Sequence, residues 1–440
     1  MADPLQPAGD VRMRGFARRS TVEDALRWLD GQIVRLTEET LPLAAAAGRV
    51  LSREVHSGVD VPPFARAMMD GFALHAADTL GASPYNRLAL VLAGEASPGK
   101  PFAGRVARGQ AVQIMTGAPM PEGADAVLPA EFVEAEPEQI LAQGEVSPGK
   151  HVGLQGEDIA AGSVVLPAGR VLRPQDVGVL ASIGLGEVLL VRRPRVRIVI
   201  TGNELLPPGT PPQPYKIFDS NGPMLAALVA RDAGIARGKG DGAVLPERCP
   251  AMPGFAQNSP VPFSFPGIIP DQPEAILAAV QDEADVVIIS GGSSVGQEDF
   301  VPRLVAQHGE LAIHGIAMRP SSPTGLGRLG GRLVFLLPGN PVSCLCAYDF
   351  FAGRAIRALG GRSTDWPYRR LRVSLARKIV STVGRLDYVR VRLSEGRAEP
   401  LAIGGASVLS STTRADGFVL VPPDSEGYPP GAEVEMFLYD

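Results

Sequence analysis

The clearest hydrophobic pattern in the chain is a series of short apolar runs, each followed by a turn of small residues. Residues 195–201 (RVRIVIT), 286–289 (VVII) and 333–337 (LVFLL) are such runs. Runs of this kind are typical of strands buried on both faces of a parallel sheet. Segments with helical spacing follow them, and this alternation predicts a doubly wound α/β unit. The helices are expected near residues 221–229, 273–283, 300–307 and 342–359, and a further short strand at residues 314–318.

The chain on either side of this unit follows different patterns. A capping-box signal at residues 20–23 predicts a helix that runs to about residue 39. Short strands between residues 88 and 146 predict a small β-rich insert, and short strands after residue 367 predict a β-barrel or sandwich. The fold class is therefore α/β plus β. The expected domains are a discontinuous N-terminal domain of residues 17–57 and 153–193, an inserted β-rich domain of residues 58–152, an α/β domain of residues 194–362 and a β-barrel domain of residues 367–440.

Composition narrows the class of function. Lys+Arg total 42 and Asp+Glu 47, a formal charge of −5, so the basic excess typical of a nucleic-acid binder is missing. The 3 cysteines form no disulfide framework, which favours a reducing cytoplasm. The histidines are scattered and show no cluster of metal ligands. We expect neither a signal peptide nor a membrane span, because no apolar run is long enough.

The turn after residues 286–289 carries the strongest chemical signal. Gly291 and Gly292 allow a sharp turn and a close approach to a ligand, and Ser293, Ser294 and Gly296 continue it. Such a turn can form a nest of amides and hydroxyls that binds an anion. Asp299 then supplies a carboxylate that could hold Mg²⁺ against a phosphate. The alternative, weighted about equally for this segment alone, is an ordinary strand-to-helix turn with a solvated acidic residue.

Other turns repeat this combination of small residues and a polar group. Gly202 and Glu204 follow the run at residues 195–201. After residues 333–337, Asn340 can cap a helix that begins at Pro341, and a helix N-terminus at the end of a strand is a natural anion site. Asp70 precedes a glycine and is either part of a surface turn or a carboxylate presented at a domain edge. The stretch 238–271 is rich in proline and glycine and predicts an irregular insertion.

Taken together, the motifs AMMDGFA, MTGAPMPEGADAV, GEDI, TGNEL, SGGSSVGQED, LPGNPVS, GRLDYVR and SSTTRADGFVLVP occur in one order. The set resembles the MoeA/gephyrin E-domain family of molybdopterin molybdenumtransferases over roughly residues 20–440. The resemblance implies an elongated four-part subunit with a molybdopterin-binding α/β domain. It also implies a cytoplasmic homodimer, dimerised through the discontinuous domain, whose active site lies between one subunit's α/β domain and the other's inserted domain.

The resemblance further implies a reaction. Adenylylated molybdopterin and molybdate would be the substrates and Mg²⁺ the cofactor. The bond between the pterin phosphate and AMP is cleaved, and the metal is left on the dithiolene. The implied partners are a molybdopterin adenylyltransferase or a recipient molybdoenzyme, with no nucleic acid and no membrane.

The residues that match the family's functional positions are spread over the whole chain. The implied catalytic set is Asp70, Asp158, Glu204, Asp299 and Arg319, in which Glu204 and Asp299 are the metal ligands and Asp70 and Asp158 come from across the dimer. The implied cofactor-binding set is Thr116, Gly202, Gly291, Gly292, Ser293, Ser294, Gly296, Ser321, Ser322, Pro338, Gly339, Asn340, Pro341, Ser343, Arg385, Arg390 and Ser411.

The chain departs from the family at positively charged positions. A Lys-Pro-Gly-Lys-Pro turn is replaced by residues 319–323 (RPSSP), which keep one cation as Arg319 and put Ser322 in place of the second. Arginines expected just before Gly-Glu-Asp are replaced by Gly153, Leu154 and Gln155. The loss of each charge-assisted hydrogen bond would remove about 1.5–3 kcal/mol from the free energy of substrate binding. These departures raise the alternative function of a non-catalytic protein that binds molybdopterin or the finished cofactor and delivers it to a specific molybdoenzyme.

Overall fold

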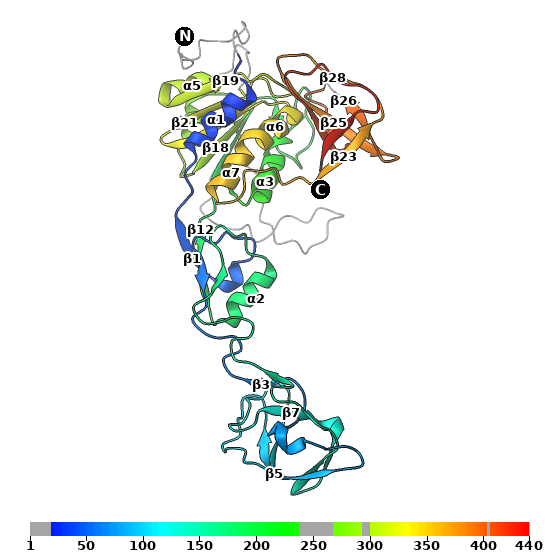
Figure 1. The fold of residues 1–440 in the computed structure, drawn as a ribbon. Coiled ribbons are helices and arrows are strands. Elements are labelled where there is room, and N and C mark those ends of the chain that lie inside the picture. The colour runs from blue at the N-terminus through cyan, green and yellow to red at the C-terminus, as the bar shows by residue number, and fades with distance from the viewer. Residues whose placement is uncertain (1–18, 238–266, 293–299, 403–404, 440) are drawn as a thin grey trace, which may run out of the picture. The chain divides into compact units, whose positions relative to one another are not determined.

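We analysed a computed structural model that describes residues 19–237, 267–292, 300–402 and 405–439 (Figure 1). The chain forms two compact units. The first unit contains residues 1–38 and 191–440, and the second unit contains residues 39–190. The finer division into four domains stays a prediction.

The centre of the first unit is a mostly parallel sheet with strand order β16-β13-β18-β22-β21-β19. The three strands β13 (Arg195–Thr201), β18 (Val286–Ser290) and β22 (Arg332–Leu337) run parallel in the middle, as their apolar runs predicted. β21 (Gly325–Leu329) and β19 (Glu310–His314) add an antiparallel edge. At the other edge, β16 (Ile235–Arg237) and β17 (Ile268–Ile269) both pair with β13.

Side chains alternate between the two faces of this sheet, and helices cover each face. Ile198, Ile288 and Phe335 pack with α1 (Val22–Gln32), α3 (Asn221–Arg231) and α7 (Gly353–Leu359). Figure 1 shows these helices together on one face of the sheet. Val287 and Val334 point to the opposite face, where they pack with α4 (Pro273–Ala279) and α5 (Val301–His308). The predicted doubly wound α/β unit is therefore confirmed. α6 (Pro341–Ala347) and a π-helical turn, η4 (Tyr348–Ala352), complete the first helical layer.

The C-terminal strands close into a barrel. β25 (Leu386–Ser394), β26 (Arg397–Ala402), β23 (Arg370–Leu375), β29 (Glu433–Leu438) and β27 (Gly417–Val421) pair in this order, and β27 pairs back with β25. Buried aliphatic side chains such as Val389, Val419 and Met436 form its core. The strand patterns predicted a barrel or a sandwich, and the structure shows a closed barrel.

A buried polar network fixes the chain that joins the α/β sheet to the barrel. The fully buried Asp349 accepts hydrogen bonds from Arg231 Nη2 at 2.9 Å and from Tyr368 Oη at 2.8 Å. Its backbone carbonyl accepts one from Trp366 Nε1 at 3.0 Å. The Trp366 ring also packs edge-on against Phe418 of the barrel, with ring centroids 5.4 Å apart. The barrel is therefore firmly packed within the first unit.

The second unit contains a six-stranded sheet with order β7-β4-β6-β5-β9-β8. Its central strands are β4 (Gly71–Leu74), β6 (Gln110–Ile114) and β5 (Leu88–Ala96). A separate apolar cluster gathers residues from both ends of the unit, including Leu51, Leu172 and Leu190, around α2 (Pro174–Ser182). The outer strands of the sheet are β7 (Ala126–Pro129), β9 (Gln139–Ala142) and β8 (Val133–Ala135).

The shorter elements complete the two units. In chain order they are β1 (Glu38–Pro42), η1 (Leu43–Ala45), β2 (Val55–His56), β3 (Arg66–Ala67), η2 (Ala76–Thr79), η3 (Ala130–Phe132), β10 (Val152–Gly153), β11 (Val164–Leu166), β12 (Glu187–Val191), β14 (Leu205–Leu206), β15 (Ile217–Phe218), β20 (Met318–Arg319), β24 (Ile379–Val380), α8 (Ser410–Thr413) and β28 (Gly427–Tyr428). Among the residues that the structure describes, no helix is long and apolar enough to cross a membrane.

Two predictions about local structure were wrong. The first helix ends at Gln32 instead of about residue 39, because β1 pairs with β12 and the chain is already extended at Ile33. Its N-cap is Thr21, whose side chain accepts from Asp24 N at 3.0 Å. The strand expected at residues 314–318 is interrupted, because Gly315 has a φ of 91° and separates β19 from β20.

The buried carboxylate of Asp176 makes the second unit sensitive to acid. It accepts hydrogen bonds from Arg173 Nη2 at 3.1 Å and from Arg170 Nη2 at 2.9 Å. These bonds, that of Arg173 first, lower the pKa of Asp176. A lowered pKa stabilises the folded state above the unfolded pKa of about 3.9, and this stabilisation is lost as the pH falls further.

We expect Asp176→Asn to destabilise α2 by about 1.5 kcal/mol at pH 7, because a buried carboxylate loses its charge-assisted hydrogen bonds to two partly exposed arginines. The difference from the wild type should shrink below about pH 4. Amide hydrogen exchange of peptides from α2 measures the loss of stability at pH 7 and at low pH. Glu134→Gln is the matched control, since its 2.5 Å ion pair with Arg87 is half-exposed and should contribute at most about 0.5 kcal/mol. A difference that is the same at pH 7 and pH 3 would contradict this account.

Candidate active site

Three turns meet at the carboxyl ends of the central parallel strands. They are residues 201–204 after β13, Gly291 and Gly292 after β18, and residues 338–340 after β22. Because β13, β18 and β22 are neighbours in the sheet, the turns lie side by side. Ligands of open α/β sheets bind at this edge. The structure therefore brings Gly202, Glu204, Gly291, Gly292, Pro338, Gly339 and Asn340 together, as the sequence predicted for this edge.

The first two turns are in direct backbone contact at Gly291. A Cβ built on this residue would lie 2.1 Å from the Thr201 carbonyl oxygen, and its φ is 106°. Glycine is the residue that tolerates both the short distance and the positive φ. Gly339 also approaches closely, because a Cβ on Gly339 would lie 3.8 Å from Gly291 Cα. Gly339 is exposed at this edge, whereas Gly202 is buried and Gly291 N donates to the Leu337 carbonyl at 3.4 Å.

Asp271 holds the first turn in place. Its carboxylate accepts hydrogen bonds from the Thr201 hydroxyl and, at 3.1 Å, from Asn203 N. The neighbouring Glu204 is exposed, and a Cβ built on Gly202 would lie 2.9 Å from Glu204 Oε2. The Glu204 carboxylate therefore lies over the glycine of the turn. Asp271 is engaged with the protein, whereas Glu204 faces solvent and is the carboxylate suited to a ligand or metal ion.

Asn221 connects the second and third turns. Its Nδ2 donates to Ser290 Oγ at 3.0 Å and to the Gly339 carbonyl at 2.7 Å. Asn221 is 7% exposed and stands in the first turn of α3. The sequence predicted only a helix near residues 221–229. In the structure the Asp219 carboxylate accepts from Gly222 N at 2.9 Å and caps this helix. From the first turn of α3, Asn221 thus fixes the second and third turns relative to each other.

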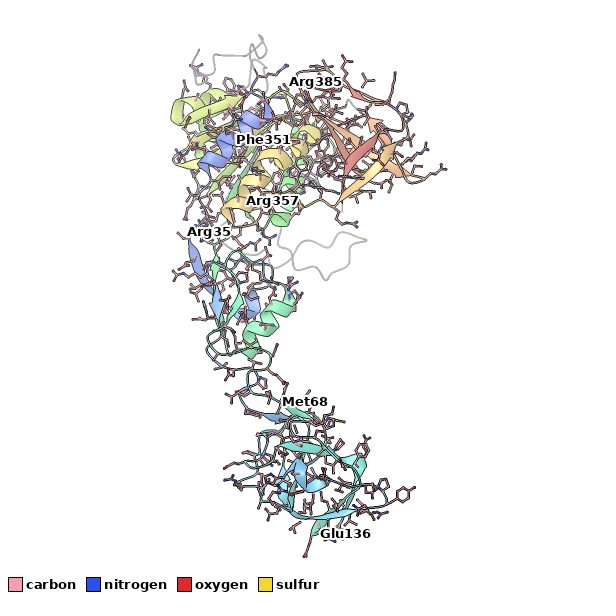
Figure 2. The ribbon with its side chains drawn as sticks, in the orientation of Figure 1. Arg35, Met68, Glu136, Phe351, Arg357 and Arg385 are labelled. Atoms are coloured by element: carbon pink, nitrogen blue, oxygen red, sulfur yellow. The ribbon has the colours of Figure 1, made fainter. Side chains whose placement is uncertain are left out.

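Arg319 and Arg385 share one buried carboxylate. Arg319 Nη2 donates to Asp387 Oδ2 at 2.7 Å, and Arg385 Nε donates to Asp387 Oδ1 at 3.0 Å. Ser381 Oγ adds a third bond at 2.9 Å. Asp387 is 1% exposed, while each arginine side chain is about a third exposed. Two positive charges and one negative charge leave this cluster cationic and suited to an anion; Figure 2 shows Arg385 on the barrel.

Ser321 links this cationic cluster to the third turn. Its hydroxyl donates to the Ser343 carbonyl at 2.5 Å, inside α6. Ser321 is buried and has a φ of 87°. Ser322 Oγ is buried and has no hydrogen-bond partner among the described residues. At the start of α6, Val342 N is occupied by the Ala406 carbonyl at 3.0 Å, so this amide is not available to an anion.

Two residues that the resemblance places near the oxyanion are buried in the barrel. Arg390 is 1% exposed, and burial lowers the pKa of Arg390. Ser411 is 3% exposed, and its hydroxyl donates to the Val408 carbonyl at 2.5 Å. Their assignment to the site stays a prediction.

The predicted residues of the second unit form their own group. Asp70 Oδ1 accepts from Thr116 N and from Thr116 Oγ1, both at 2.7 Å. These two bonds lower the pKa of Asp70, which is exposed and therefore presents a fixed carboxylate. Asp158 is also exposed, and its backbone N donates to the Val61 carbonyl at 3.1 Å.

Some predicted residues lie outside the described part of the chain: Ser293, Ser294, Gly296 and Asp299. Within the described part, no group of three or more His, Cys, Asp or Glu side chains could hold a metal ion. The residues that sequence reasoning missed are Asp271 and Asp387, together with the positioning role of Asn221. No local pattern identifies them, because each acts on a segment far away in the chain.

We expect Gly291→Ala to lower the free energy of unfolding of the first unit by about 3 kcal/mol or more, because the new Cβ collides with backbone in a left-handed conformation. Gly209→Ala is the matched control: it has a φ of 84° but nothing within 4 Å of an added Cβ. It should cost only about 1 kcal/mol. Tryptophan fluorescence during denaturation measures this, since Trp28 and Trp366 both lie in the first unit. Equal losses for the two variants would refute the close approach.

We expect Asn221→Ala to destabilise the first unit by about 1–3 kcal/mol, because two buried hydrogen bonds are lost. Asn221→Asp should cost more, since a carboxylate oxygen would face the Gly339 carbonyl. Asn340→Ala is the control, as its side chain makes no capping bond and its loss should change stability by at most about 0.5 kcal/mol. The same fluorescence assay applies, and an Asn221→Asp variant as stable as the wild type would show that the amide is not needed.

Comparison with protein families identifies matching models along most of the chain. The MoeA N-terminal region (domain I and II) matches residues 20–184, the probable molybdopterin binding domain matches residues 249–358, and the MoeA C-terminal region (domain IV) matches residues 372–439. The three matches follow one another in order.

Individual relatives agree with these matches. The molybdopterin molybdenumtransferase 2 of Mycobacterium tuberculosis is 33% identical over 90% of this chain and 94% of its own length. A molybdopterin molybdenumtransferase of Staphylococcus aureus is 27% identical over 95% of each chain. A crystal structure of the molybdopterin biosynthesis MoeA protein from Pyrococcus horikoshii superposes with a TM-score of 0.79 at 30% identity, covering 96% of this chain and 99% of that chain. The chain therefore belongs to the MoeA family of molybdopterin molybdenumtransferases.

Proposed function

We propose that this protein inserts molybdate into adenylylated molybdopterin and releases AMP in a Mg²⁺-dependent step. Its family acts in molybdenum cofactor biosynthesis, and relatives at 27–33% identity are named molybdopterin molybdenumtransferases. The single observation that carries the proposal is the meeting of three glycine-containing turns beside a cationic cluster. A substrate with two phosphates and a second oxyanion requires both kinds of contact.

The turns and the arginines would serve different parts of the substrate. The exposed backbone at Gly339 and Asn340 offers amides to the phosphates, in the way that nests of backbone N–H groups bind anions. The exposed guanidinium groups of Arg319 and Arg385 offer charge-assisted hydrogen bonds to an oxyanion. Asp387 holds both arginines by one carboxylate, so their orientation is set before a ligand arrives.

The donor set at the first turn fits Mg²⁺. This ion is usually held by one or two carboxylates together with substrate phosphates and water, and Glu204 is an exposed carboxylate at the turn. Glu204 would hold the ion together with Asp299. When bound, Mg²⁺ would offset negative charge on the phosphate groups. Asn221 and Asp271 would meanwhile keep the backbone of the turns in position.

The second unit would contribute the fixed carboxylate of Asp70 and the exposed carboxylate of Asp158. We propose that the protein acts as a cytoplasmic homodimer in which these two residues serve the second copy's substrate. Their exposure leaves them available to a ligand, and Thr116 keeps Asp70 ionised by donating two hydrogen bonds.

We expect a single-turnover assay with adenylylated molybdopterin, molybdate and Mg²⁺ to show AMP release coupled to formation of metal-loaded cofactor. Glu204→Gln and Asp299→Ala should each slow AMP release at least about a hundredfold, the effect of losing one electrostatic contact to a developing charge. Omission of Mg²⁺ should do the same. The control is Glu187→Gln, an exposed glutamate at the start of β12, which should leave the rate unchanged.

Two outcomes would contradict the proposal. Tight binding of the pterin without AMP release would indicate a protein that delivers the cofactor without making it. AMP release that does not require molybdate would indicate a hydrolase of the adenylylated pterin. Both outcomes are visible in the same assay, because AMP and the loaded cofactor are quantified separately.

A further inference from the structure

The strand pair β3–β10 places Arg66 directly opposite a glycine. Gly153 pairs with Arg66 in antiparallel register. A Cβ built on Gly153 would lie 3.4 Å from Arg66 Cγ and 2.9 Å from Glu157 Oε1. The stem of Arg66 therefore occupies the space beside position 153. A positive charge that could otherwise stand on β10 stands on the neighbouring strand.

Arg66 is not committed to a structural role. Its side chain is 45% exposed, and its Nη2 lies 3.4 Å from Glu157 Oε1. The other carboxylate oxygen of Glu157 accepts from Leu154 N at 2.9 Å, so Glu157 is already positioned by the backbone. Exposed ion pairs of this length contribute little to stability. The guanidinium can therefore turn to a ligand without loss of structure.

The strand β3 is bonded to both segments that carry the predicted carboxylates of the second unit. On one side, Ala67 N donates to the Ala118 carbonyl at 2.9 Å, and Gly117 N donates to the Ala67 carbonyl at 2.8 Å. These bonds tie β3 to the loop whose Thr116 holds Asp70. On the other side, β10 continues into the turn that carries Asp158. Figure 2 labels Met68, which directly follows β3.

An anionic substrate that approaches Asp70 and Asp158 meets charges of its own sign. Glu157 adds a third carboxylate to this surface. A cation in the same strand pair offsets that repulsion, and an arginine presents several N–H groups in a plane that matches phosphate and related oxyanions. Leu154 and Gln155 do not supply such a charge: Leu154 is exposed and apolar, and Gln155 Nε2 donates to Asp60 Oδ2 at 2.8 Å.

Resting on the proposed function, we propose that Arg66 is a substrate-binding cation of the second unit. It donates charge-assisted hydrogen bonds to a tetrahedral oxyanion of the reaction, either a phosphate of the adenylylated pterin or molybdate. Gly153 lies opposite Arg66 in the strand pair, and a Cβ there would border both the Arg66 stem and the Glu157 carboxylate.

The test is a set of variants of the full-length protein. Arg66→Ala should raise the KM for adenylylated molybdopterin or for molybdate by about tenfold to a hundredfold, with a smaller effect on the single-turnover rate at saturation. Which of the two KM values rises identifies the oxyanion. Arg66→Lys keeps the charge and should lose less. Arg105→Ala is the matched control, since Arg105 belongs to the same unit and makes an exposed 3.5 Å ion pair with Glu122.

A double variant that moves the arginine from position 66 to position 153 distinguishes a role of Arg66 in substrate binding from a role in stability. In Arg66→Ala/Gly153→Arg, the Arg66 stem is removed and the end of the Glu157 side chain, 2.9 Å from a Cβ at position 153, has to turn aside. The new arginine should restore the raised KM to within about threefold of the wild-type value. Failure of this rescue, with both variants melting at the wild-type temperature, would overturn the proposal. An unchanged KM in Arg66→Ala would overturn it as well.

Failure of the proposed function is distinguishable from failure of this inference. If the wild type releases no AMP, the proposed function fails. Equilibrium titration of wild type and Arg66→Ala with molybdopterin and with molybdate then decides on Arg66 alone. Affinities that differ by less than about twofold for both probes would overturn the inference. A tenfold loss that weakens as salt is added would support it, because exposed charges are screened.

Discussion

The contact between the Gly291 backbone and the Thr201 carbonyl is the constraint on which the candidate site depends. It requires the ends of β13 and β18 to stand at the same level, and the parallel register from Val196 and Val286 to Ile200 and Ser290 ensures this. Side chains of these strands alternate between two separate cores, so a shift by one residue would move every apolar side chain to the wrong face. The packing of two helical layers thus fixes the position of the glycine turns.

A second constraint concerns charge. The α/β sheet and the barrel are joined at β20 and β25, where Arg319 pairs with Asp387 in parallel register. Burial of the Asp387 carboxylate without hydrogen-bond partners would cost folding free energy. Arg319, Arg385 and Ser381 are its partners. Since one negative charge serves two cations, the pair retains positive charge at the surface. The way in which Asp387 holds Arg319 and Arg385 thus keeps both cations oriented at this turn.

The sequence predicted those parts of the fold that local patterns control. The bounds of β13, β18 and β22 agree with the predicted runs to within one residue, because each is a continuous run of strand-forming residues. The first helix was predicted too long, since Ile33 and Leu36 continue its spacing while the pairing of β1 with β12 decides the backbone.

Prediction of the site followed the same rule. Gly291, Gly339 and Glu204 follow strands and could be placed from the sequence. Asn221 and Asp271 could not, because their partners lie 118 and 70 residues away in the chain. The roles of Arg66 and Gly153 depend on a strand pairing across more than half of the second unit, which the sequence does not show.

The arrangement of β16 and β17 has a consequence for how this protein can be altered. Both short strands pair with the same edge of β13, β16 at Arg195–Arg197 and β17 at Ile200 and Thr201. The chain between them therefore leaves and rejoins the sheet only a few residues apart along one strand. The entropy of closing a chain segment between two fixed ends grows slowly with the length of the segment. This edge is thus a natural point at which to insert a fluorescent or affinity module, because the insert would join two ends that the sheet already holds together.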